Sequence, residues 1–284
     1  MTQSKWTAFP YPDKAYAYAG AALEKNWPRL HAGDREPFPS LGYVEAQYAA
    51  HSGLKPAGDA QTCAESLQEA WRAYHRGDFG HAIEEGLAIG PLGTNVANKA
   101  SNIYATYLAP NADDALALYQ ETCHRAEQLQ ALAPRLANAW YLHGQAMGRY
   151  SQGISIAVAM TQGLAGKVKV SLDRAIHLEP HHADAEIALG AYHAEIIGKV
   201  GSLIGGLTYG ASKDAAIGHF EKALRLNPES AIARIEYAGA LAQMFGRARA
   251  AEARRLYEAA AACKPADAME HFDVELAKAR ATGR

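Results

Sequence analysis

The sequence predicts an all-α protein, a right-handed solenoid of about five helix pairs with two enlarged connections inside the pairs. Alanine, the strongest helix former, is the most frequent of the 284 residues. An A-x-x-x-x-P segment ends at Pro180, Pro228 and Pro265, and Pro134 ends an earlier segment in the same way. Because a proline disfavours α conformation in the residue before it, each of these prolines marks the end of a helical unit.

Composition and charge argue against several classes of function. Lysine and arginine number 28 against 30 aspartate and glutamate, a net charge of -2, so we expect no general affinity for nucleic acid or for a membrane surface. Apolar residues make up 49% of the chain, which excludes disorder. No apolar run is long enough for a membrane span, and the N-terminus has no signal-peptide pattern. Cys63, Cys123 and Cys263 lack the spacing of a disulfide framework, so we expect a cytoplasmic location.

The N-terminal region, residues 1–62, is irregular and aromatic. We expect it to form an arm that packs into a groove or a cap of the helical body. The motif of Trp27 and His31 recurs at Trp71 and His75, and the stretch between them, rich in proline and glycine, indicates a loop with a short helix. Six aromatic residues belong to this region: Trp6, Phe9, Tyr11, Tyr16, Tyr18 and Trp27.

Residues 63–134 are expected to form degenerate helical repeats. The Gly77–Phe79 turn divides one helix pair, and Pro110 separates two further helices over 95–109 and 111–133. Asn111 or Asp113 can cap the second of these helices, because a side-chain oxygen at that position accepts a hydrogen bond from a free backbone N–H group.

Residues 135–265 carry three more regular repeats. Each has a small residue in its first helix, at Gly144, Gly190 and Ala238, where the second helix must approach closely. Larger side chains at fixed positions fill the space around that contact, and a proline closes the unit. Residues 266–284 are more polar and are expected to form a terminal capping helix.

Two of these repeats are longer than the usual period of about 34 residues, each at the connection between its two helices. The inserts, 149–167 and 196–213, are apolar, rich in glycine and flanked by lysine. Glycine inside a helix costs about 1 kcal/mol relative to alanine. Gly201, Gly205, Gly206 and Gly210 therefore predict a helix extension followed by an ordered loop. The inserts can pack together as extra core, line a ligand cavity or form an oligomer interface.

From Trp140 to Pro265 the pattern resembles the tetratricopeptide-repeat superfamily, which implies a helical solenoid that binds other molecules on its concave face. The segment 183–228 has the form LGxYxxE, a stretch rich in glycine, then AxxHFxKALxLxP. In this it is similar to the T component of TRAP-type periplasmic uptake systems and to the regulator of microtubule dynamics family. The first likeness implies a ligand cleft and a periplasmic partner, but this sequence shows no signal peptide or lipobox.

No catalytic or cofactor-binding motif is present, so we expect a binding protein and not an enzyme, without a cofactor or a metal. His182, Glu186 and His193 return to one helix face and are a candidate polar cluster. A contact between helices is favoured over a metal site, because Glu186 and His193 occupy core positions of the repeat and no cysteine lies nearby in the sequence.

Three asparagines, Asn95, Asn98 and Asn102, share one helix face beside Lys99. Asparagine is unfavourable inside a helix, so three on one face need a reason. They form hydrogen bonds between helices, or they line a polar groove that holds a peptide backbone or a small polar ligand.

The residues that would line the concave groove are mainly apolar. We therefore expect an adaptor or scaffold that holds an apolar or amphipathic protein segment. The alternative is a small-molecule carrier whose cavity is closed by the inserts, and self-association through the inserts is compatible with both. An enzyme that uses the cluster around His182 is the third hypothesis. The groove residues are Tyr141, Gln145, Ile187, Ala191, Ile232 and Ile235.

A basic patch follows the third repeat's first helix. It consists of Arg247, Arg249, Arg254 and Arg255. This patch is interpreted as a solvated helix face, with a docking site for an acidic partner as the alternative.

Overall fold

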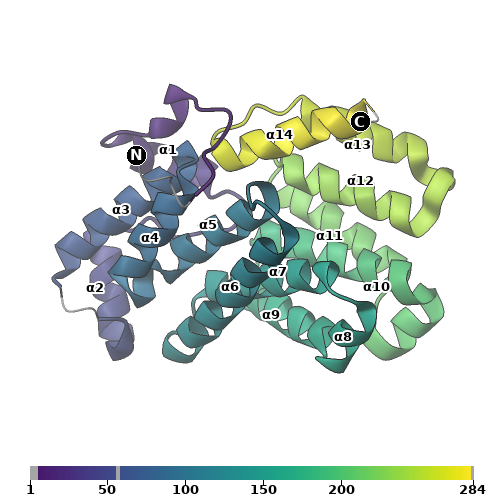
Figure 1. Ribbon diagram of the computed structural model, residues 1–284, viewed down its shortest axis with the longest axis horizontal. Helices are drawn as coiled ribbons and strands as arrows, with labels where there is room; N and C mark the ends of the chain where they lie inside the picture. The colour runs from purple at the N-terminus through teal and green to yellow at the C-terminus, as the bar shows by residue number, and fades with distance from the viewer. Residues whose placement is uncertain (1–5, 56–57, 283–284) are drawn as a thin grey trace.

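The computed structural model describes residues 6–55 and 58–282, and every regular element in these ranges is helical. Antiparallel helix pairs stack one on the next along the chain (Figure 1). This confirms the predicted all-α solenoid of about five helix pairs. The pairs are α3 (Ala60–Arg76) with α4 (Phe79–Ile89), α5 (Thr94–Tyr107) with α6 (Ala112–Leu132), α7 (Ala137–Gly153) with α9 (Leu164–Leu178), α10 (Ala183–Tyr209) with α11 (Lys213–Leu226), and α12 (Ala231–Phe245) with α13 (Ala250–Ala261).

The remaining elements are short. Before the first pair lie the 3-10 turn η1 (Lys14–Ala17), α1 (Ala22–Leu30), α2 (Leu41–Ala50) and η2 (Ser52–Leu54). The turn η3 (Pro91–Gly93) precedes α5, and η4 (Gly246–Arg249) connects α12 to α13. Side-chain oxygens cap several helix starts. Asn111, one of the two caps that the sequence suggests, accepts from the backbone N–H of Asp114, and Asp59 accepts from that of Thr62.

The aromatic N-terminal segment, as far as it is described, packs onto the helical body. The Phe9 ring lies edge-on to Phe272 at 5.0 Å between centroids, and Trp27 lies edge-on to Trp71 at 5.7 Å. Residues 1–5 of the expected arm lie outside the described residues. The two copies of the Trp–His motif thus pack against each other in one core, which also receives the C-terminal helix.

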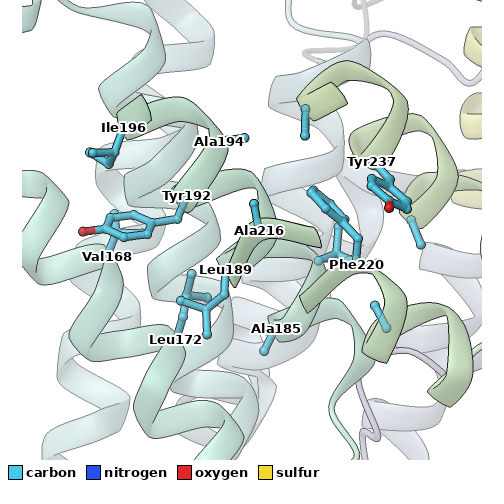
Figure 2. Close-up of a cluster of buried hydrophobic side chains, with 14 of the residues drawn as sticks. Val168, Leu172, Ala185, Leu189, Tyr192, Ala194, Ile196, Ala216, Phe220 and Tyr237 are labelled. Carbon is cyan, nitrogen blue, oxygen red and sulfur yellow. The ribbon is translucent and has the colours of Figure 1, made fainter. Parts of the chain in front are cut away.

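Small residues bring the two helices of a repeat into contact. A Cβ atom at Gly190 would lie 2.8 Å from the Phe220 ring, and one at Gly144 would lie 2.8 Å from Leu172. Figure 2 shows Phe220 directed from α11 toward Tyr237 of the next repeat, and the two rings stack at 5.1 Å. The glycine-to-large-residue contact therefore recurs within successive repeats, and the stacking of Phe220 on Tyr237 extends the core from one repeat to the next.

Both inserts are helix–break–helix units, so the expected loop in the second insert is wrong. In the first insert the break is followed by α8 (Ile156–Thr161) and by Gly163 in left-handed conformation. In the second, α10 is interrupted only at Gly201, with φ 79° and ψ 164°, and 202–209 is helical again. Gly205 is buried, and a Cβ atom there would lie within 4 Å of Ile196, Ile197 and Ala211, so packing against these residues outweighs the low helix propensity of glycine.

The C-terminal helix α14 (Ala268–Ala281) joins the two ends of the solenoid. It packs on α12 and α13 and also contacts α3, and it lies next to α1 in Figure 1. Arg29 of α1 donates two hydrogen bonds to the Glu270 carboxylate, at 2.6 and 2.8 Å. Within the described residues, none of the helices has the length and apolarity needed to cross a bilayer.

Candidate ligand-binding cavity

A cavity of about 240 Å³ lies between the helices of the solenoid. Its walls come from α1, α5, α7, α8, α9, α10, α12 and α14, so residues far apart in the sequence meet there. Apolar side chains, mainly of α8, α9 and α10, form one part of the lining, which we call the apolar half. The charged side chains of the lining form the other part, which we call the charged half, and on α10 the two sets alternate, with Glu195 and Lys199 beside Ile196 and Val200. A mainly apolar space with a few converging polar groups is typical of small-molecule sites.

The apolar half is built by the two inserts and the helices that carry them. Ile156 and Met160 of α8 line the cavity and are also 48% and 58% exposed, so the cavity reaches the surface at α8. The second insert contributes Val200 and Tyr209. The other apolar residues of this half are Ala159, Leu164, Val168, Leu172, Ile187, Ala188, Ala191, Tyr192 and Ile196.

In the charged half, every cation that the described residues contribute is paired. Four cations and six carboxylates of the described residues line the cavity. The pairs are Arg29 with Glu270, Lys99 with Asp34, Arg149 with Glu236 at 2.7 Å, and Lys199 with Glu195 at 2.8 Å. Two carboxylates, Asp184 and Asp273, therefore have no cationic partner in the described part of the chain.

These two carboxyl groups line the cavity and form no ion pair with the described residues. The Asp184 carboxyl lies over Gly33, where a Cβ atom would clash with it. Burial raises the pKa of Asp184 to about 7, and Lys99 opposes this shift. Asp273 is buried and accepts a 2.6 Å hydrogen bond from the Tyr107 hydroxyl, and burial raises its pKa well above the usual value. Both groups hold a proton more readily than a surface aspartate does.

A buried ionic network supports this half of the cavity. Asp34 accepts hydrogen bonds from Lys99 and from His31 Nδ1, the latter at 2.9 Å. The ammonium of Lys99 also lies 5.5 Å from the centre of the Tyr74 ring. Burial raises the pKa of Asp34, but Lys99 and His31 outweigh this and hold it well below the usual range. The loop after α1 is thereby fixed against α5.

The candidate cluster of His182, Glu186 and His193 is divided between two surroundings. His182 Nδ1 accepts from the backbone N–H of Ala185 at 3.1 Å, so its Nε2 carries the proton and donates to Asn138 Oδ1 at 2.8 Å. This hydrogen bond and burial agree with a neutral ring, whose pKa burial lowers to about 4. The helix N-terminus of α10 is thus capped by the His182 ring.

The other two members of the cluster face α11. The Glu186 carboxylate pairs with His219 Nδ1 and with Lys222 Nζ, each at 2.6 Å. His193 stacks on His219 with 5.4 Å between ring centroids. Among the described residues, no group of three or more His, Cys, Asp and Glu side chains is arranged to hold a metal ion. Glu186 and His193 of α10 thus contact α11 through His219 and Lys222.

The three asparagines lie inside the protein and do not line the cavity. Asn98 Oδ1 accepts from Arg125 Nε at 2.8 Å, and Asn102 Nδ2 donates to Gln145 Oε1 at 2.8 Å. Asn95 Nδ2 donates to the Glu36 carboxylate at 3.3 Å. These amides connect α5 to α6, to α7 and to the loop after α1. Hydrogen bonding between helices is one of the two roles that the sequence suggests for the three asparagines.

Five of the six groove residues line the cavity. They are Tyr141, Gln145, Ile187, Ala191 and Ile232. Ile235 does not: it is buried with Ala260, Val274 and Ala277, because α14 covers that part of α12. The groove that the repeat pattern predicts is therefore the wall of a cavity, and the C-terminal helix closes one end of it.

Sequence reasoning missed the charged half of the cavity. Asp34, Asp184 and Asp273 come from three distant segments, and no local spacing connects them. A weak signal exists at Asp184, but an acidic residue in the first turn of a helix is favourable and therefore indicates only an ordinary helix start. Tyr107 and Asp273 meet only because α14 folds back to the first half of the chain.

These stacked antiparallel helix pairs form an α-solenoid with a tetratricopeptide-like fold. Among solved structures, the chain is similar to a thermophilic TPR protein of Thermus thermophilus, with a TM-score of 0.54 and 17% sequence identity. The likeness covers 76% of this chain and 98% of that one and is a likeness of fold. No family model matches the chain, and no curated protein matches it in sequence.

Proposed function

We propose that this chain is a non-catalytic binding protein whose inner cavity holds a small amphipathic molecule. The ligand has an apolar body, which lies between the inserts, and an amine or another hydrogen-bond-donating group, which reaches Asp184 and Asp273. The observation that carries the proposal is a cavity with an apolar half and two carboxyl groups that no cation of the described residues pairs.

The apolar half favours an aliphatic or aromatic body. Apart from the exposed Ile156 and Met160, its side chains belong to the main hydrophobic core or pack against it, so most of this wall is formed before any ligand arrives. A ligand that buries about 200 Å² of apolar surface gains on the order of 5 kcal/mol from this contact alone. The remaining affinity and the selectivity must come from the charged half.

The charged half favours a cation over an anion. An anionic group would meet Asp184 and Asp273, while the four cations that the described residues place in the wall already hold carboxylates. A ligand ammonium instead replaces the proton that these carboxyl groups retain, and it gains a charge-assisted hydrogen bond. A neutral donor such as an alcohol also donates a hydrogen bond to these carboxyl groups, but this bond is weaker because the donor carries no charge.

A protein segment is the second candidate ligand. Tyr141, Ile187 and Ile232 come from the first helices of three successive repeats and line the same wall. This is the surface on which helical repeats hold extended or helical segments. The opening at α8 admits a chain end or a protruding side chain. An adaptor role would follow if such a segment, and not a free small molecule, occupies the cavity.

Chain-matched probes test the charge preference. Isothermal titration with decylamine, decanol and decanoate is expected to rank them in that order of affinity. Asp184→Asn combined with Asp273→Asn should remove at least about tenfold of the preference for the amine and leave decanol binding nearly unchanged. Equal affinity for amine and carboxylate would contradict the charge assignment.

A variant that fills the cavity tests whether the ligand binds there. Ala191 lines the cavity, so Ala191→Trp should abolish binding of all three probes. Ala242 is exposed on α12 and does not line the cavity, so Ala242→Trp is the matched control and should bind as the natural chain does. If no probe binds the natural chain, screening of a displayed peptide library against it, with Ala191→Trp as the negative control, decides for or against the adaptor role.

A further inference from the structure

Most of the large apolar side chains that are over 45% exposed in the described residues lie at the ends of the two inserts, and Val170 of α9, at 63%, is the exception. Leu203 is 76%, Ile204 55% and Leu207 83% exposed, all on the last part of α10. On α8, Ile156, Val158 and Met160 are exposed as well. We call α8 and residues 202–209 the insert tips. Soluble monomers rarely expose apolar groups so closely spaced without a binding role.

The insert tips lie on one edge of the solenoid. They connect the first to the second helix of successive repeats, and the turn η4 does the same in the third repeat. In Figure 1 these connections follow one another from α8 at the lower right, past the end of α10, upward along the right edge to the connection between α12 and α13. The Phe245 ring connects the start of α11, which follows the second tip, to η4: Lys213 Nζ lies 4.4 Å and the Arg249 guanidinium 5.1 Å from the centre of the ring.

The charges inside three segments of this edge are all positive. Carboxylates just outside these segments pair with three of the cations: Asp173 with Lys169, Glu195 with Lys199 and Glu252 with Arg249. The segments 150–172, 196–213 and 241–251 contain no aspartate or glutamate. They do contain cations, of which Lys167 and Arg247 are exposed and have no ion pair among the described residues. A net charge of -2 for the whole chain therefore hides an edge that is apolar and positively charged.

We propose that this edge, formed by the insert tips and η4, docks on the surface of an anionic lipid bilayer. Apolar side chains on short helices enter the boundary between headgroups and acyl chains, and neighbouring lysine and arginine side chains attract anionic headgroups. A second copy of the chain fits less well, because a symmetric contact would place the same cations against each other. Docking would also place the cavity opening at α8 against the lipid.

Vesicle flotation tests this directly. The protein is expected to float with vesicles of phosphatidylcholine and phosphatidylglycerol, to bind pure phosphatidylcholine much more weakly, and to lose affinity at high salt. Leu203→Glu with Leu207→Glu should abolish binding, and Lys167→Glu with Arg247→Glu should weaken it at least about tenfold. Leu132→Glu, at an exposed apolar residue of α6 away from this edge, is the matched control and should float as the natural chain does.

Several results would overturn the proposal. One is a natural chain that does not float with anionic vesicles, and another is flotation that the tip variants leave unchanged. A concentration-dependent dimer that the Leu203 and Leu207 variant disrupts, without any vesicle binding, would assign the edge to a second copy. Leu203 and Leu207 do not line the cavity, so decylamine titration of the same variant shows separately whether the ligand site is intact.

Discussion

At the scale of single residues, a buried ion pair holds the charged half of the cavity in place. Lys99 and Asp34 are both almost fully buried, and His31 completes the set. A buried ion without a partner loses its hydration and gains nothing in return. The charges of Lys99 and Asp34 therefore depend on each other. The pair positions the wall of the cavity next to Asp184 and is not itself free to bind a ligand.

Removal of Lys99 should show that Asp34 depends on it. Lys99→Met is expected to lower the free energy of unfolding by about 3–5 kcal/mol, measured by urea denaturation, because Asp34 is left as a buried, unpaired charge. The double variant with Asp34→Asn should recover part of this loss. Lys169 and Asp173 form an exposed pair, so Lys169→Met is the control and should cost under about 1 kcal/mol. Equal losses at the two lysines would show that the buried pair is not coupled.

Asp184 gives the protein a pH-dependent stability. Its pKa is raised in the folded state, so the folded chain retains a proton that the unfolded chain releases. The contribution of Asp184 is therefore complete below about pH 4 and is lost as the pH rises through about 7. Asp184→Asn keeps the group neutral and should raise Tm by a few degrees at pH 8 while leaving it nearly unchanged at pH 4.

Thermal scans across this range, with Asp173→Asn as an exposed control, check the sign. A Tm difference between the Asp184→Asn variant and the natural chain that does not grow as the pH rises from 4 to 8 would show that the Asp184 carboxyl is not held neutral by burial.

At the scale of the helices, close packing depends on glycine at defined crossings. Gly190→Ala would place a Cβ atom 2.8 Å from the buried Phe220 ring, which cannot move without displacing Tyr237. We expect a loss of about 1–3 kcal/mol in chemical denaturation, which is typical of overpacking. Gly218, on the neighbouring α11, has nothing within 4 Å of its Cβ direction, so Gly218→Ala should be stabilising by up to about 1 kcal/mol. Stabilisation of both variants would contradict this view of the helix contact.

The helices and their contacts also show which features the sequence predicts and which it does not. The spacing of Gly144 and Gly190 from the large residues that cover them is local, so the repeats and their helix pairs are predictable. The break at Gly201 is local too, but the helix after it depends on the packing of Gly205 against other segments. The net charge predicts no attraction to a membrane surface, whereas the proposed lipid contact depends on where the cations of the insert edge lie in the fold. The meeting of Asp184 and Asp273 depends on the closure of the whole solenoid.

At the scale of the whole molecule, the solenoid is closed by contacts between its two ends. The N-terminal segment, α3, α4 and α14 share one aromatic core, and Phe9 lies in it between Phe79 and Phe272. Asp273 and Glu270 line the cavity only because α14 is held in this position. The ends of the chain therefore determine the shape of a site in its middle.

Phe9→Ala tests this closure. The ring is buried, and its removal should cost about 3 kcal/mol of stability because it leaves a space among rigid aromatic neighbours. Since the same core holds α14, hydrogen exchange should show the amides of α14 losing protection together with those of α3 and α4. Tyr11 is 40% exposed and stacks on His271, so Tyr11→Ala is the matched control and should change protection little. Loss of protection confined to the N-terminal segment would mean that α14 is held by α12 and α13 alone, and the cavity would then not depend on the N-terminus.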